Sequence, residues 1–153
     1  HINATGTPPK RQPGNTPAVV RSDDDGALLL TAATAEIYGD TLVYEEKYGN
    51  LGFWRSPNDK AVWTLAAKSA GEYEVRLNWA RDGSSTNNHL RLRIGGAELV
   101  TPIESTGTWD DYRESSLGTI RLELGQHRAV IRPAAELDGF LFDLKSIRLV
   151  PKD

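Results

Sequence analysis

The chain has 153 residues with 18 basic and 21 acidic side chains, so its net charge of −3 lacks the clustered basic excess of nucleic-acid binders. It contains no cysteine, which excludes disulfides, cysteine-ligated zinc, iron–sulfur clusters and covalently attached c-type haem. The length is that of one domain, and no apolar run approaches the roughly 20 residues that span a bilayer. Because the chain begins with His1 rather than Met, we interpret it as a processed or excised piece of a longer protein.

Residues 1–25 differ in composition from the rest of the chain. They hold half of the eight prolines, contain no aromatic side chain and end in the acidic run Asp23-Asp24-Asp25. This composition cannot bury a core, so we predict a linker or an extended lead-in segment that ends in a solvated turn.

From residue 26 onward the pattern predicts β-strands. Apolar and polar residues alternate without a break at 73–79, 90–94 and 120–124, and shorter candidates lie at 28–30, 42–44, 61–65, 129–132 and 141–150. Glycine-containing turns separate these runs, and no window shows a convincing helical stripe. Short strands at this spacing predict an all-β fold, an antiparallel β-sandwich over residues 26–153.

The sequence carries no known catalytic signature. It has no G-x-S-x-G elbow, H-E-x-x-H, P-loop or G-x-G-x-x-G motif. A glycosidase needs two carboxyl groups facing each other across a cleft, whereas neighbours in a strand, such as Glu45-Glu46 and Asp110-Asp111, point to opposite faces. We therefore predict that the chain is not an enzyme.

Aromatic residues lie in glycine-punctuated stretches between the predicted strands. Phe53 and Trp54 follow Gly52, and Trp109 follows the run 106–108. Such rings are either tucked under the sandwich or held out for a ligand, and a flat ring with polar neighbours suits the apolar C–H face and hydroxyl rim of a pyranose. The candidate hydroxyl partners near these loops are Asn50, Asp59, Asp82, Asn87, Asn88 and Asp110.

Five motifs, in order between residues 27 and 150, resemble those of family 6 and family 35 carbohydrate-binding modules. The first combines A-E-I-Y at 35–38, L-V-Y-E-E at 42–46 and N-L-G-F at 50–53. The others are A-G-E-Y-E-V-R-L-N-W-A at 70–80, T-G-T-W-D-D-Y at 106–112, L-E-L-G-Q-H at 122–127 and F-D-L-K-S-I at 142–147. Together and in this order, the five motifs are specific to the superfamily rather than to one ligand.

The resemblance implies a jelly-roll-like, galactose-binding-like sandwich that binds sugar in loops at one end and carries a structural calcium ion. By position, the calcium ligands would be Glu36, Glu45 or Glu46, and Asp143. Calcium takes about six to eight oxygen ligands, and converging carboxylates repel one another without a cation. Asp143 also interrupts the apolar run 140–144, where a bare carboxylate is costly. The alternative is that Glu36 and Asp143 are ordinary surface charges.

The resemblance also implies the sugar-binding residues and the setting of the module. Trp109 and Phe53 would form the platform, while Tyr112 would be structural. Trp54, Asn50 and Asp110 are added to the predicted ligand-binding residues because they lie beside these two in the sequence. The expected partners are a poly- or oligosaccharide and neighbouring domains of a large secreted bacterial polypeptide. The expected location is therefore extracellular or periplasmic, and the expected oligomeric state is a monomer. The alternative is a structural β-sandwich that docks a neighbouring domain through the same face and binds no sugar.

Overall fold

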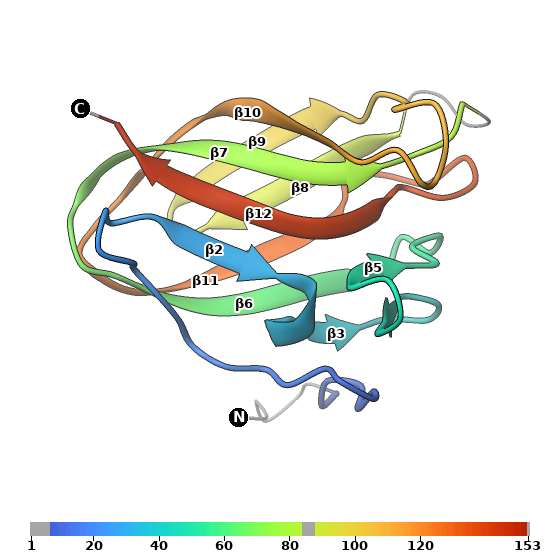
Figure 1. The fold of residues 1–153 in the computed structure, drawn as a ribbon, viewed down its shortest axis with the longest axis horizontal. Helices are drawn as coiled ribbons and strands as arrows, with labels where there is room; N and C mark the ends of the chain where they lie inside the picture. The colour runs from blue at the N-terminus through green and yellow to red at the C-terminus, as the bar shows by residue number, and fades with distance from the viewer. Residues whose placement is uncertain (1–6, 84–87, 153) are drawn as a thin grey trace.

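The computed structural model describes residues 7–83 and 88–152 and shows two β-sheets packed face to face (Figure 1). Sheet A has the strand order β1-β6-β11-β8-β9, with β3 also paired to β6, and sheet B has the order β10-β7-β12-β5-β4, with β2 also paired to β12. The strands of sheet A are β1 (Val20–Arg21), β3 (Glu36–Tyr38), β6 (Lys60–Ala67), β8 (His89–Ile94), β9 (Ala97–Pro102) and β11 (Gly125–Pro133). Those of sheet B are β2 (Leu28–Thr31), β4 (Val43–Glu45), β5 (Asn50–Gly52), β7 (Gly71–Ala80), β10 (Arg113–Leu122) and β12 (Asp143–Pro151).

This architecture confirms the predicted all-β antiparallel sandwich. Between the strands of the described residues, only β1 and β6 pair in parallel. The one helical element in the described part of the chain is a single 3-10 turn, η1 (Ala32–Thr34), and no helix there is long and apolar enough to cross a membrane.

Alternation along the strands builds the core between the sheets. In β7 the side chains of Tyr73, Val75, Leu77 and Trp79 are buried, whereas the residues between them are only partly so. Each such side chain contributes about 1.5–3 kcal/mol when it is fully buried. The predicted alternating runs 73–79 and 90–94 lie in β7 and β8, and the run 120–124 overlaps β10 only as far as Leu122.

Of the strands of which the sequence predicts little or nothing, which include β1, β3 and β5, the longest are β9 and β10. Strand β9 forms a hairpin with β8 after Gly95-Gly96, and it is exposed at every second residue because it is the edge of sheet A. Strand β10 begins at Arg113, seven residues before the predicted run, because its first half is a polar edge that buries little. Edge strands carry a weak hydrophobic signal, which explains both differences.

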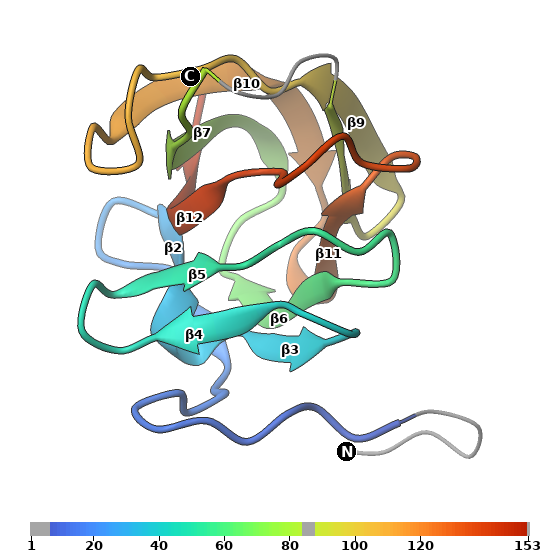
Figure 2. The same ribbon diagram turned by 90° about the vertical axis from the view of Figure 1, so that its right-hand side faces the viewer.

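The lead-in segment is attached to the sandwich by hydrogen bonds. The Nδ2 group of Asn15 donates to the carbonyl oxygens of Ala33 at 3.1 Å and Ala35 at 2.9 Å, and the backbone N–H of Lys10 donates to Ile37 O at 2.8 Å. Figure 2 shows this segment running past β3 and β4. Residues 1–6 lie outside the described part, and the predicted domain boundary after residue 25 falls between β1 and β2. The boundary itself stays a prediction.

Candidate functional site

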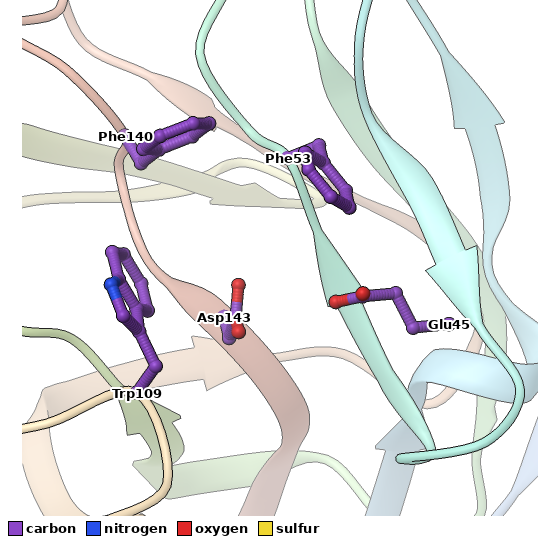
Figure 3. Close-up of a pocket in the computed structure, with 5 residues that line it drawn as sticks. All are labelled: Glu45, Phe53, Trp109, Phe140 and Asp143. Atoms are coloured by element: carbon purple, nitrogen blue, oxygen red, sulfur yellow. The ribbon is translucent and has the colours of Figure 1, made fainter.

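The segments after β5, before β10 and before β12 meet at the end of the sandwich that lies on the right in Figure 1. Side chains from these segments and from β4 and β12 line a pocket. It has a volume of about 210 Å³. Figure 3 shows the five side chains that line it, which are Glu45, Phe53, Trp109, Phe140 and Asp143. Four of them were singled out from the sequence, two as sugar platform and two as metal ligands, and the structure places them in one recess.

Three aromatic rings form the apolar part of the pocket, and Phe140 is the central one. The ring centroids of Phe53 and Phe140 are 6.3 Å apart at an interplanar angle of 76°, and those of Trp109 and Phe140 are 6.0 Å apart at 89°. Such edge-to-face contacts stabilise ring positions by about 0.5–1.5 kcal/mol each. The guanidinium of Arg55 lies 5.6 Å from the Phe140 ring centroid. Phe140 was not predicted as a site residue, although it follows Gly139 at the start of an apolar run next to a predicted ligand.

The backbone at Phe53 is held in the left-handed region, with φ at 58°. A non-glycine residue pays roughly 1–2 kcal/mol for this conformation, and such strain concentrates at functional sites. Here it turns the Phe53 ring, which is 54% exposed, out of β5 and into the pocket. Backbone strain therefore presents this ring to solvent.

Trp54, predicted beside the sugar platform, lies in the core instead. Its side chain is fully buried, its indole N–H donates to the carbonyl oxygen of Asp59 at 3.1 Å, and its ring centroid is 5.4 Å from that of Phe142. The adjacent rings of Phe53 and Trp54 therefore have different environments, one in the pocket and the other in the core. Trp54 supports the pocket from below and does not line it.

Two carboxylates form the floor of the pocket. Glu45 ends β4 and Asp143 begins β12, and Gly52 of β5 lies between them. A Cβ atom at Gly52 would collide with the Glu45 carboxylate and come within 3.2 Å of Asp143 Oδ1, so only glycine leaves room for both. Asn50, predicted as a ligand contact, is buried and donates from Nδ2 to Glu45 Oε1 at 2.9 Å. It therefore positions Glu45.

The electrostatic environment of this floor is strongly negative. Burial, together with the negative charge of Glu45, raises the pKa of Asp143 to about 7. Burial also raises the pKa of Tyr112, with further contributions from the charges of Asp143, Glu45 and Asp110. The ammonium group of Lys145 lies 4.3 Å from the Tyr112 ring centroid. A cation or a cluster of hydrogen-bond donors would be favoured at the floor.

Two of the remaining polar candidates lie near the pocket or support it. Asp110 is exposed and follows Trp109 but does not line the pocket. Asn88 is buried, donates from Nδ2 to Asp138 O at 2.8 Å and Phe140 O at 3.2 Å, and accepts from the Asp138 N–H. Asn88 therefore holds the segment that presents Phe140.

The other hydroxyl-partner candidates have different outcomes. Asp59 is buried, and although burial alone would raise its pKa, hydrogen bonds led by those from Thr41 hold that pKa below its usual range. It closes a loop rather than facing a ligand. Asp82 is half-buried and is not among the pocket-lining residues, and Asn87 lies outside the described residues.

The structure does not bring the four predicted calcium ligands together. Glu36 lies in sheet A, where its carboxylate accepts from Arg128 at 2.7 Å and from the Tyr38 hydroxyl at 2.5 Å. Glu46 is exposed and faces Gly14 of the lead-in segment. Within residues 7–83 and 88–152, no three His, Cys, Asp or Glu side chains group around a common point. Only Glu45 and Asp143 meet.

Comparison with known proteins finds the same fold among carbohydrate-binding modules. No known family profile matches the chain. A segment of 83 residues, 54% of the chain, is 31% identical to the beta-agarase AgaA of Microbulbifer thermotolerans and spans 19% of that protein. A family 35 carbohydrate-binding module from Clostridium thermocellum superposes with a TM-score of 0.68 at 19% identity, covering 82% of this chain and 98% of that one.

A family 6 example gives the same result. The carbohydrate-binding module of Cellvibrio mixtus lichenase 5A, solved in complex with cellotriose, superposes with a TM-score of 0.63 at 18% identity, covering 82% of this chain and 97% of that one. The chain thus has the β-sandwich fold of the family 6 and family 35 carbohydrate-binding modules, as the sequence motifs predict.

Proposed function

We propose that the chain is a non-catalytic carbohydrate-binding module whose pocket holds one sugar unit of an oligo- or polysaccharide. The observation that carries this proposal is the convergence of three aromatic rings over two carboxylates in one recess. A pyranose presents an apolar C–H face to such rings and hydroxyl donors to such acceptors. Covering one face hides on the order of 80 Å², which is worth about 2 kcal/mol at roughly 25 cal/mol per Å².

The shape of the site favours sugar binding over docking of a neighbouring domain. A docking face is expected to be a flat, continuous apolar patch, whereas these rings surround a hollow with a charged floor. In this proposal the module acts as a monomer within a larger secreted polypeptide, and its sandwich positions the pocket without performing chemistry.

A glycan-array screen of the wild-type protein with calcium present tests this function. We expect binding to at least one glycan and clearly weaker binding to it by Trp109→Ala. The same glycan, incubated with the wild-type protein, is expected to release no reducing sugar. Reducing sugar that scales with protein and disappears in Asp143→Asn would refute the non-catalytic assignment.

We further propose that calcium binds at the floor of the pocket, held by Glu45 and Asp143. The paired carboxylates and the space kept free at Gly52 suit a hard cation. Because two carboxylates supply only part of a calcium coordination sphere, the remaining oxygens would come from backbone carbonyls, water or sugar hydroxyls. A bound ion would neutralise the floor and fix the end of β4 against the start of β12.

Chelation is expected to lower the melting temperature at pH 8 by roughly 5–10 °C relative to calcium at a hundredfold excess over Kd. Without calcium, the raised pKa of Asp143 favours the protonated form of the folded protein at pH 5. The free energy of unfolding of the calcium-free protein therefore falls as the pH rises through about 7. The calcium effect should therefore be larger at pH 8 than at pH 5.

Two variants make this calcium test specific. Asp143→Asn should abolish the calcium response, while Glu36→Gln, which changes a carboxylate in sheet A, should preserve it. An unchanged melting curve after verified metal removal would favour the alternative in which these carboxylates are ordinary charges.

A further inference from the structure

Residues 10–16 of the lead-in segment, which we call the strap, lie along the outer edge of strand β4. Within the described residues β4 pairs only with β5, so its other edge has no strand beside it. Figure 2 shows the strap passing this edge. The position matters because β4 ends at Glu45, one of the two carboxylates of the pocket floor.

Side chains of the strap bind the backbone groups that β4 leaves unpaired. The ammonium group of Lys10 donates to the carbonyl oxygen of Leu42 at 3.0 Å, and the side-chain oxygen of Gln12 accepts from the backbone N–H of Tyr44. Backbone groups of every second residue point to the same edge of a strand, so these two face away from β5. The strap therefore takes the place of a neighbouring strand.

A third contact lies beyond Glu45. Gly14 has φ at 76°, and a Cβ atom there would collide with the carboxylate of Glu46, so the Glu46 side chain lies directly against the strap. The contacts at residues 42, 44 and 46 thus hold the chain on both sides of Glu45.

The strap is attached at both of its ends to the segment that runs from η1 into β3. The backbone N–H of Lys10 donates to Ile37 O at 2.8 Å, and that of Thr16 donates to Ala33 O at 2.7 Å. The side chain of Asn15 adds the bonds described above. Because β3 belongs to sheet A and β4 to sheet B, the strap links the two sheets at this edge.

Strand β4 has few other attachments. Its three residues are only partly buried, and β5, its partner, pairs with β12 at a single position, Leu51 with Leu144. Burial of Leu51 fixes β5 in the core, but a short two-stranded hairpin adds little stability of its own. Loss of the strap is therefore expected to loosen β4, and Glu45 with it, more than the rest of the sandwich.

We propose that the strap is part of the binding site, with Gln12 as a positioning residue that holds Glu45 in the pocket floor through Tyr44. The purpose of this position rests on the proposed calcium and sugar site, whereas the attachment rests on the contacts above. A carboxylate that occupies its binding position for only part of the time binds with an affinity reduced by that fraction. The functional unit therefore includes residues 10–16, which the predicted boundary after residue 25 leaves out.

The test variant is Gln12→Met, which keeps the length and neutrality of the side chain and removes the acceptor for the Tyr44 N–H. A neutral change is needed because loss of the Lys10 charge would by itself alter calcium binding. The matched control is Tyr73→Phe, which removes a hydrogen bond of 2.6 Å from the hydroxyl group to Ser69 O. This bond lies near the start of β7, at the end of the sandwich remote from the pocket.

NMR of the full chain, without calcium or sugar, gives the first readout. In Gln12→Met we expect the Tyr44 amide to exchange with solvent roughly fivefold faster than in the wild type, while the amide of Val75 in β7 keeps its rate. The side-chain amide of Asn50 donates to Glu45 Oε1, so its signal should shift when that carboxylate moves. The control should change neither the Tyr44 rate nor the Asn50 signal.

Calorimetric titration with calcium alone gives the second readout. We expect Gln12→Met to bind calcium roughly fivefold more weakly than the wild type and the control to bind it equally well. An unchanged affinity in Gln12→Met, beside a wild type that binds calcium, would overturn the proposal.

The NMR outcomes separate the strap from the proposed function. The proposal would be overturned if either the Tyr44 rate or the Asn50 signal stayed as in the wild type. Equal acceleration at Tyr44 and Val75 would also overturn it, because this would show a general loss of stability. If the expected NMR changes appeared while the wild type bound neither calcium nor any glycan, the strap would be supported and the calcium and sugar assignments would fail.

Discussion

Replacing Trp109 by alanine is expected to weaken sugar binding about thirtyfold and to leave the melting temperature nearly unchanged. The lost stacking surface is worth about 2 kcal/mol, and about 1.4 kcal/mol corresponds to a factor of ten in affinity. Stability is spared because Trp109 is only half-buried and its ring contact in the pocket is an edge contact with Phe140. Titration calorimetry with the glycan that the array identifies, together with thermal melting, measures both effects.

Trp79→Ala is the control for this experiment. Trp79 lies in β7, is only 6% exposed and donates its indole N–H to Glu104 O at 2.9 Å. Its truncation opens a cavity and is expected to cost about 3–5 kcal/mol of stability. If Trp109→Ala melted as early as Trp79→Ala, Trp109 would be a core residue and the docking alternative would be preferred.

The adjacent rings Phe53 and Trp54 are expected to respond in opposite ways. Trp54→Ala should lower the free energy of unfolding by about 3–5 kcal/mol, because it leaves a cavity against Phe142 and an unpaired Asp59 carbonyl. Phe53→Gly should leave the protein at least as stable as the wild type, because glycine adopts φ near 58° without strain. The same substitution should weaken sugar binding, since it removes one ring of the pocket.

Urea unfolding of the two variants and calorimetric titration of Phe53→Gly give these quantities. Phe53→Ala separates the contributions, since it removes the ring and keeps the left-handed strain. A Phe53→Gly variant that bound sugar as tightly as the wild type would show that this ring is not part of the site.

The sequence predicted the sandwich because alternation is a property of single strands, and β7 shows it over its whole length. It predicted that Phe53, Trp109 and Asp143 matter, but it could not predict that they meet, because they come from distant segments. The left-handed backbone at Phe53 could not be predicted, because glycine is the residue that normally signals this conformation. The resemblance predicted that Glu36 lies near Asp143, whereas the structure pairs Glu36 with Arg128 of the same sheet. This pairing could not be predicted, because Arg128 is 92 residues away along the chain.

Strand β12 runs from the pocket to the opposite end of the molecule, which matters for the design of fusion proteins. It begins at Asp143 in the pocket and runs through nine residues to Pro151, a distance of roughly 26 Å at about 3.3 Å per residue. Figure 1 shows the C-terminus at the opposite end from the segments that form the pocket. A reporter or enzyme fused after Lys152 would therefore lie at the end of the sandwich opposite the pocket. The pocket would remain accessible to an insoluble surface as large as a cell wall.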